Sequence, residues 1–266
     1  MCRNISKEFI MNNKLTTLFQ TSSKNLLNVY CTAGFPKKES TTEVLLALQK
    51  SGVDMIEIGM PYSDPIADGP VIQDSNMIAI ANGMTIELLF KQLKKIKKDI
   101  NVPLILMGYL NPVMQYGIEK FCVDAASSGI AGLILPDLPM YEYEHIYKKY
   151  FTLNNLSLIF LITPQTAVER ILKADDLSSG FLYAVSSNSI TGSTLNTDGQ
   201  NEYFSKLAAL KLKNPLMIGF GINSKETFNN ACKYSAGAIV GSAYIKAISN
   251  AKNIQTATSN FIKTIR

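Results

Sequence analysis

The chain has 266 residues, of which 47% are hydrophobic and 18% charged, and its net charge at pH 7 is +5. That apolar fraction excludes intrinsic disorder, because it buries enough surface to offset the lost chain entropy. The charge is mild for this length, so we expect no nucleic-acid partner. The longest apolar runs are strand-sized, so we expect no membrane-spanning helix.

Short apolar segments alternate with amphipathic helical segments, which is typical of a parallel sheet built from strand–helix units. The pattern begins with a helix over 14–23, which we expect to plug the bottom of a barrel. Eight such units favour a closed (β/α)8 TIM barrel over an open sheet, in a single domain spanning residues 1–266. The expected strands are 27–33, 55–59, 104–108, 132–136, 156–162, 181–186, 216–220 and 237–241.

The second and third strands start 49 positions apart (104 − 55), farther than the other neighbours. The additional length holds the loop SDPIADGP and an extra helix within VIQDSNMIAIANG. Long loops after barrel strands lie on the carboxyl-terminal face, where this fold places its catalytic groups. We therefore expect the loop SDPIADGP to lie on the face that carries the catalytic groups.

Two other features are predicted to be structural. The lysines at 91, 94, 95, 97 and 98 lie opposite the apolar stripe of the helix over 86–100, which indicates a solvated face. The single histidine, His145, lies among charged and tyrosine residues of an amphipathic helix, so we expect it near the surface. One histidine and four widely spaced cysteines give no metal-site pattern, and we expect no metal.

Glu57 is the first candidate catalytic residue. Side chains alternate along a strand, so Ile56 and Ile58 face the helices while Glu57 faces the barrel axis. Burial there raises the pKa of a carboxyl group toward the range useful for proton transfer. The alternative is an internal ion pair, but the strand segments contain no lysine or arginine to form one.

Asp68 is the second candidate, in the loop after the same strand. Two separated carboxylates at one barrel mouth would allow one to transfer a proton while the other accepts a hydrogen bond from substrate. Asp64 precedes Pro65, and its spacing favours a turn-forming role. Spacing alone does not decide between these roles.

Glycines follow the last two strands, in IGFGINS and GAIVGSAYIKAI. Glycine lets the backbone approach a ligand, and N–H groups at the helix start opened by Gly241 and Ser242 favour an anion. This is the recurrent phosphate position of barrel enzymes, to which Gly192 after the sixth strand could add a donor.

The segment EIGMPYSDPIADGP closely resembles the signature of the tryptophan synthase alpha subunit. The resemblance continues in order through YCTAGFP, GYLNPVMQYG, LPDLP, SITGS, GFGI and GAIVGSA, over essentially the whole chain. It implies a (β/α)8 barrel with an added N-terminal helix. It also implies a carbon–carbon lyase of tryptophan biosynthesis, which cleaves indole-3-glycerol phosphate to indole and glyceraldehyde 3-phosphate by a retro-aldol reaction.

The resemblance also assigns residues. Glu57 matches the residue that protonates indole carbon 3 and handles the proton of the adjacent hydroxyl, and Asp68 matches the carboxylate that accepts the indole N–H. Thr191 belongs to a loop that closes on the Asp68 loop. Ser187, Ser189 and Phe35 depart from residues frequent in the family, but leave both carboxylates in place. The remaining implied contacts are pocket aromatics Tyr30, Tyr109 and Tyr183, and phosphate-binding backbone at Gly192, Gly221, Gly241 and Ser242.

The family works as an αββα complex, in which a beta subunit receives indole and holds pyridoxal phosphate. The resemblance places Pro61 to Pro65 and Asn111 to Tyr116 on the contact face and implies no cofactor in this chain. Two alternatives are a free-standing indole-3-glycerol phosphate lyase and a catalytically slack barrel that mainly activates its partner. Without a signal or transit peptide pattern, we expect the cytoplasm, or the plastid stroma for a plastid-encoded chain.

Overall fold

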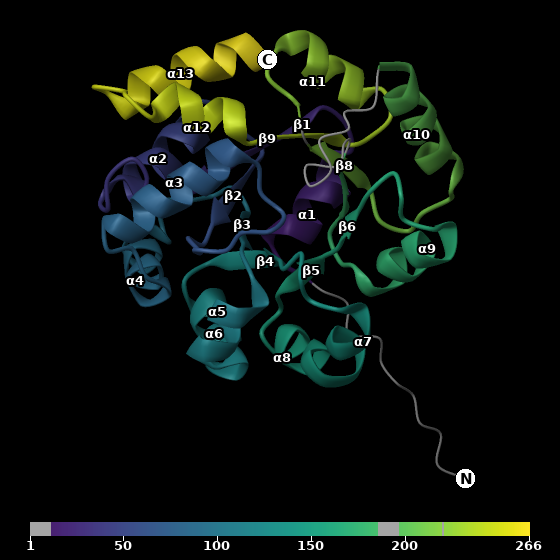
Figure 1. Cartoon of the computed structure of the whole chain (residues 1–266), viewed down its shortest axis with the longest axis horizontal. Helices are drawn as coiled ribbons and strands as arrows, with labels where there is room; N and C mark the ends of the chain where they lie inside the picture. The colour runs from purple at the N-terminus through teal and green to yellow at the C-terminus, as the bar shows by residue number, and fades with distance from the viewer. Residues whose placement is uncertain (1–11, 186–196, 220) are drawn as a thin grey trace.

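The protein is described by a computed structural model that covers residues 12–185, 197–219 and 221–266. Its strands form one parallel sheet in the order β5-β4-β3-β2-β1-β9-β8-β7-β6, surrounded by helices (Figure 1). The strands are β1 (Leu26–Thr32), β2 (Met55–Gly59), β3 (Leu104–Met107), β4 (Ile130–Ile134), β5 (Ser157–Ile159), β6 (Leu161–Ile162), β7 (Leu182–Val185), β8 (Leu216–Gly219) and β9 (Gly237–Val240).

The barrel closes through β5 and β6, which are two pieces of one extended segment separated by Phe160. β5 pairs with β4 on one side, and β6 pairs with β7 on the other. Between them, the Phe160 N–H donates to Ser178 Oγ over 3.2 Å, and the Phe160 carbonyl accepts the Tyr183 N–H over 3.1 Å. The predicted barrel is confirmed. Its fifth strand, expected over 156–162, is divided at Phe160, where the segment stops pairing with β4 and begins to pair with β7.

The helices alternate with these strands, as the sequence predicts. The extra helix after β2 is confirmed as α3, while the short α5 and the π-helical turn η1 were not expected. The helices are α1 (Lys14–Thr21), α2 (Ser40–Lys50), α3 (Pro70–Ala81), α4 (Ile86–Ile96), α5 (Leu110–Tyr116), α6 (Ile118–Ser127), α7 (Met140–Glu142), η1 (Tyr143–Tyr147), α8 (Lys148–Leu153), α9 (Val168–Leu177), α10 (Thr197–Ala209), α11 (Lys225–Cys232), α12 (Ser242–Ile248) and α13 (Ile254–Ile265).

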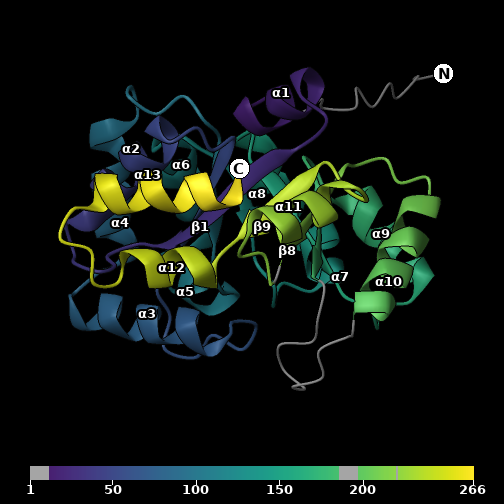
Figure 2. The same ribbon diagram turned by 90° about the horizontal axis from the view of Figure 1, so that it is seen from above.

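Helix α1 covers one end of the barrel, opposite the end where α3 lies (Figure 2). Its Leu15 is fully buried, and Asn13 caps the helix by accepting the N–H groups of Leu15 and Thr16. The Asn13 side-chain amide also donates to the carbonyls of Ala131 and Asn155, each over 3.0 Å. The predicted plug is therefore confirmed, and it is attached by hydrogen bonds as well as by packing.

The first and last strand–helix units of the chain lie side by side and complete the ring of helices. β1 pairs with β2 and with β9, so the first and last strands are neighbours, and α13 contacts α2. Arg266 donates to the Gly52 carbonyl over 2.8 Å and forms an ion pair of 2.9 Å with Asp54. The carboxyl end of the last helix is thus fastened to the first strand–helix unit.

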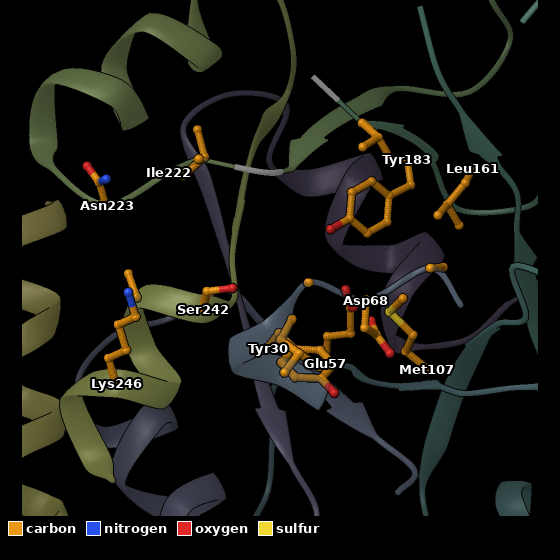
Figure 3. A pocket seen from close by; sticks show the side chains of 16 residues that line it. Tyr30, Glu57, Asp68, Met107, Leu161, Tyr183, Ile222, Asn223, Ser242 and Lys246 are labelled. Carbon is orange, nitrogen blue, oxygen red and sulfur yellow. The ribbon is translucent and has the colours of Figure 1, made fainter. Parts of the chain in front are cut away.

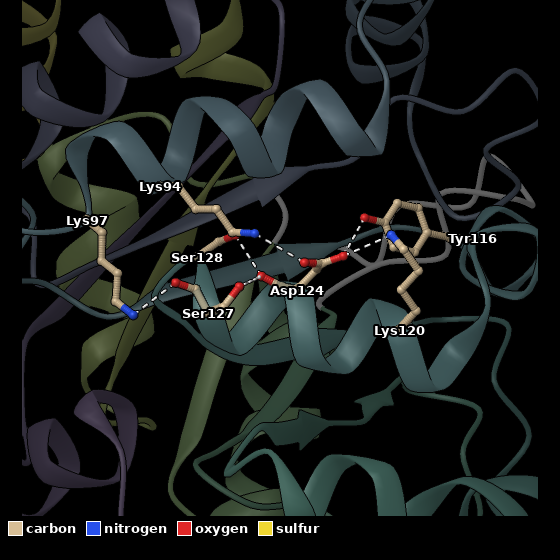
Figure 4. A network of polar contacts seen from close by, with 7 residues as sticks. All are labelled: Lys94, Lys97, Tyr116, Lys120, Asp124, Ser127 and Ser128. Atoms are coloured by element: carbon tan, nitrogen blue, oxygen red, sulfur yellow. Dashed lines mark hydrogen bonds and ion pairs between the residues drawn. The ribbon is translucent and has the colours of Figure 1, made fainter.

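The lysine-rich face of α4 is exposed as predicted, but two of its lysines also connect helices (Figure 4). Lys94 forms an ion pair of 3.1 Å with Asp124 of α6, and Lys97 donates to the Ser127 carbonyl over 2.9 Å. His145 lies in η1 with about half of its side chain exposed, which confirms its surface position. Over 12–185, 197–219 and 221–266, no helix has the length and apolar character needed to cross a bilayer.

Candidate active site

A cavity of about 530 Å³ opens at the carboxyl ends of the strands (Figure 3). Residues from β1, β2, β3, β6 and β7 contribute to it, together with the loop after β2, the turn after β8 and helices α3 and α12. Its lining is Tyr30, Glu57, Ala67, Asp68, Gly69, Ile72, Met107, Leu161, Tyr183, Val185, Gly221, Ile222, Asn223, Ser242, Ala243 and Lys246.

Glu57 projects from β2 into this cavity, as strand alternation predicts, and is only 1% exposed. The side-chain amide of Asn28 donates to Glu57 Oε2 over 3.1 Å. Burial raises the pKa of Glu57 to about 8, against the opposing effect of the Asn28 hydrogen bond, and the negative charge of Asp68 raises it further. Glu57 is therefore mostly protonated at pH 7.

The side chain that donates a hydrogen bond to Glu57 is the amide of Asn28, and no ion pair among the described residues includes Glu57, so the alternative of an internal ion pair with lysine finds no support there. A neutral amide compensates a buried carboxylate far less than a cation does. The carboxyl group consequently remains easy to protonate, which an ion pair would prevent.

Asp68 reaches the same cavity from the loop between β2 and α3. Its Oδ2 accepts a hydrogen bond of 3.0 Å from the Tyr109 hydroxyl, which in turn accepts the Ala67 N–H over 2.9 Å. Burial raises the pKa of Asp68 to about 6, and the Tyr109 hydrogen bond limits the rise. Asp68 is therefore ionised at pH 7, whereas Asp64 is exposed and does not line the cavity.

Tyr30 and Tyr183 flank the carboxylates, and each ring lies against a glycine. A Cβ atom at Gly59 would lie 1.9 Å from the Tyr30 hydroxyl, and one at Gly219 would lie 2.3 Å from the Tyr183 ring. Only glycine leaves room for these rings. Burial raises the pKa of both phenols well above the usual value, so they stay neutral near Glu57.

The other predicted contacts are distributed unevenly. Gly221 and Ser242 line the cavity, and Gly241 directly precedes Ser242 without being part of the lining. Tyr109 is likewise not a lining residue, but its hydroxyl contacts the lining residue Asp68. Thr191 and Gly192 lie outside the described residues, as do Ser187 and Ser189.

Several lining residues were not predicted from the sequence. Lys246 follows Ser242 by four residues on α12, a spacing that places both on one helix face and could have identified it. Ile72, Met107 and Leu161 supply an apolar surface suited to a flat aromatic ring. Their sequence context resembles that of any core residue, so no local signal distinguishes them.

The arrangement combines a protonated acid with an ionised carboxylate in one largely apolar cavity. Such a pair serves reactions in which one group transfers protons while the other stabilises positive charge. Among the described residues, no group of three or more histidine, cysteine, aspartate or glutamate side chains could hold a metal ion.

Comparison with known proteins agrees with this chemistry. A family model described as "Tryptophan synthase alpha chain" matches residues 17–266. The chain is 51% identical over 243 residues to the tryptophan synthase alpha chain of Flavobacterium psychrophilum, covering 91% of this chain and 95% of that one. It is 49% identical over 255 residues to that of Christiangramia forsetii, covering 96% and 98% respectively.

Solved structures give the same result. The crystal structure of tryptophan synthase subunit alpha from Legionella pneumophila superposes with a TM-score of 0.87 at 32% identity, covering 96% of this chain and 97% of that one. A Mycobacterium tuberculosis tryptophan synthase chain superposes with a TM-score of 0.84 at 29% identity, covering 96% and 98%. The chain therefore belongs to the tryptophan synthase alpha chain family and is a carbon–carbon lyase of tryptophan biosynthesis that cleaves indole-3-glycerol phosphate to indole and glyceraldehyde 3-phosphate.

Proposed function

We propose that Glu57 carries both proton transfers of the cleavage. Protonated Glu57 first donates its proton to indole carbon 3, which converts the ring to a cationic tautomer. The resulting carboxylate then removes the proton of the adjacent side-chain hydroxyl, the bond to carbon 3 breaks with its electrons returning to the ring, and the hydroxyl becomes the aldehyde. Glu57 ends as it began, protonated, so the reaction balances without an added oxidant or base.

Asp68 accepts the hydrogen bond of the indole N–H in this proposal. Positive charge spreads to that nitrogen when carbon 3 is protonated, and an ionised carboxylate stabilises it more than it stabilises the neutral substrate. The hydrogen bond from Tyr109 supports this role, because it keeps Asp68 oriented and ionised.

The substrate phosphate is assigned to the opposite part of the cavity lining, at Gly221 and Ser242 with neighbouring Gly241. Tyr30 and Tyr183 then lie along the glycerol chain and the ring. Thr191 and Gly192 belong to the proposal on the resemblance alone. The proton chemistry proposed here requires neither a metal nor an organic cofactor in this chain.

One observation carries the proposal: two carboxyl groups line one cavity, and their environments hold their pKa values at about 8 and about 6. The test measures steady-state cleavage of indole-3-glycerol phosphate by Glu57→Gln and Asp68→Asn. Each should lower kcat at least a hundredfold with a small change in KM. Asp74→Asn, on the exposed side of α3, is the matched control and should retain normal turnover. Near-normal turnover by Glu57→Gln would disprove the assignment.

We also infer that the chain works with a pyridoxal-phosphate-dependent beta subunit as an αββα complex. The proposed contact segment Pro61 to Pro65 precedes the cavity residues Ala67 and Asp68, and Asn111 to Tyr116 follows Tyr109, which contacts Asp68. Ile66, next to the first segment, and Met114, in the second, are 67% and 54% exposed. Exposed apolar side chains beside an active site favour a protein partner. Indole formed in the cavity would leave toward that partner.

Adding a beta subunit distinguishes the remaining alternatives. Strong stimulation of cleavage supports the complex. If Ile66→Asp abolished this stimulation and left turnover of the isolated chain unchanged, the contact with the beta subunit would include Ile66. High activity of the isolated chain without stimulation supports a free-standing lyase, and a negligible rate under both conditions supports an activator barrel.

For location we propose the cytoplasm. The bacterial sources of the relatives named above support this choice over a plastid.

A further inference from the structure

Asn28 lies one layer deeper in the barrel than the cavity residues. It precedes Tyr30 by two residues on β1, so its side chain also points inward. The side chain is fully buried, does not line the cavity, and contacts Glu57 through the 3.1 Å hydrogen bond from Nδ2 to Oε2. Asn28 therefore approaches the acid from the side away from the substrate.

The second polar atom of this amide has no partner. Asn28 Oδ1 is buried and accepts no hydrogen bond from any described residue. Nearly all buried polar atoms are paired, so an unpaired oxygen beside a catalytic group requires an explanation. A half-turn about the Cβ–Cγ bond exchanges Oδ1 and Nδ2 and would present the oxygen to Glu57 instead.

We propose that Asn28 is a positioning residue that holds Glu57 in both of its protonation states. Nδ2 donates to the carboxylate, and after a half-turn of the amide, Oδ1 accepts the hydrogen of the protonated acid. The inference rests on the proposed role of Glu57, whose cycle requires both states in each turnover. A partner able only to donate would leave the buried acid hydrogen without an acceptor for part of the cycle.

The contribution of Asn28 to the titration of Glu57 must be distinguished from that of the other ionisable groups nearby. The charge of Asp68, in the loop after β2, raises the pKa of Glu57, while the charge of Glu57 raises the pKa values of Tyr30 and Cys31 on β1 and of Tyr183 on β7. Burial raises the pKa of both phenols and of the thiol, so these groups stay neutral near pH 7. Asp68 is the described neighbour that also titrates near neutrality, and its midpoint must be followed in parallel.

The first experiment is a carbon-13 NMR titration of the whole chain without substrate, with labelled glutamate and aspartate. Glu57 is assigned by the signal lost in Glu57→Gln. Asn28→Leu removes the donor at similar volume and should raise the Glu57 midpoint by about one pH unit or more, with the Asp68 midpoint moving less. Asn76→Leu is the matched control, because Asn76 is also a buried asparagine with an unpaired Oδ1. It should leave the Glu57 midpoint in place.

The second experiment uses the unaltered chain, so it does not depend on the folding of a variant. Nitrogen-15 signals of the Asn28 side-chain amide should shift with the midpoint of Glu57, because the amide reverses when the acid is protonated. Amide signals that remain constant through that midpoint overturn the reversal. An unchanged Glu57 midpoint in a folded Asn28→Leu variant overturns the positioning role.

Turnover gives the final readout. Asn28→Leu should lower kcat about tenfold with little change in KM, and should move the alkaline limb of its pH profile upward with the NMR midpoint. Normal turnover by Glu57→Gln would instead disprove the proposed function, and the NMR titrations would still decide whether Asn28 follows the protonation of Glu57.

Discussion

The Tyr109 hydroxyl donates to Asp68 Oδ2 over 3.0 Å while it accepts the N–H of Ala67 over 2.9 Å. One phenol from the segment after β3 therefore fixes both the backbone and the carboxylate of the loop after β2. The orientation of Asp68 depends on a residue 41 positions away in the chain.

Tyr109→Phe should impair cleavage most at low pH. The lost hydrogen bond favours ionised Asp68, so its removal raises the pKa of Asp68 above about 6. We expect kcat/KM to fall roughly tenfold at pH 6 and less at pH 8. Tyr244→Phe removes another buried hydroxyl contact, of 2.8 Å with Thr258, and should leave the shape of the pH profile unchanged. A uniform loss at all pH values in Tyr109→Phe would argue against this role.

The unaltered enzyme should show a bell-shaped profile of kcat/KM. Activity rises as Asp68 loses its proton near pH 6 and falls as Glu57 loses its proton near pH 8. Rates measured from pH 5 to 9 check this directly. Activity that continued to rise above pH 9 would show that ionised Glu57 starts the reaction.

Glu57→Gln should stabilise the protein at alkaline pH. The pKa of Glu57 is about 8 in the folded chain, against 4.5 for an ordinary glutamate, so the folded state binds more protons between these values. Stability then falls as pH rises from about 4.5 through 8, and glutamine removes this loss. Urea unfolding should show a gain of up to roughly 4 kcal/mol at pH 9 and none at pH 4. An equal gain at both pH values would indicate better packing instead.

Gly59→Ala should displace Tyr30, because the new Cβ atom would lie 1.9 Å from its hydroxyl. We expect a loss of about 1–3 kcal/mol in unfolding free energy and a large loss of cleavage. The cost should shrink when Tyr30 is replaced by leucine, and a double-mutant cycle measures that coupling. Additive effects of the two changes would place the strain elsewhere.

Local sequence patterns predicted much of this molecule. Alternation in β2 was enough to direct Glu57 inward, and helical periodicity in α4 separated the buried Leu89 and Leu93 from the lysines. Both signals depend on residues close in sequence, so they need no knowledge of the barrel. The break at Phe160 was not predictable in this way, because it depends on which neighbours the segment pairs with.

The features that the sequence did not predict depend on contacts between segments that are distant in the chain. Asn28 meets Glu57 because β1 and β2 pair with Tyr30 opposite Glu57, a register that no local pattern contains. The sequence predicted Tyr109 as a pocket aromatic, but not that its hydroxyl would bind both Ala67 and Asp68 of the loop after β2, because that contact depends on the path of the loop. The roles of Thr191 and Gly192 stay predictions.

The pairing of the first strand with the last affects how the chain folds during synthesis. One edge of β1 has no partner until residues 237–240 have left the ribosome, and α2 lacks its contact with α13 until later still. An open edge of a parallel sheet invites pairing with other chains. The barrel can close only near the end of translation, so the nascent chain must protect Leu26–Thr32 from aggregation until then.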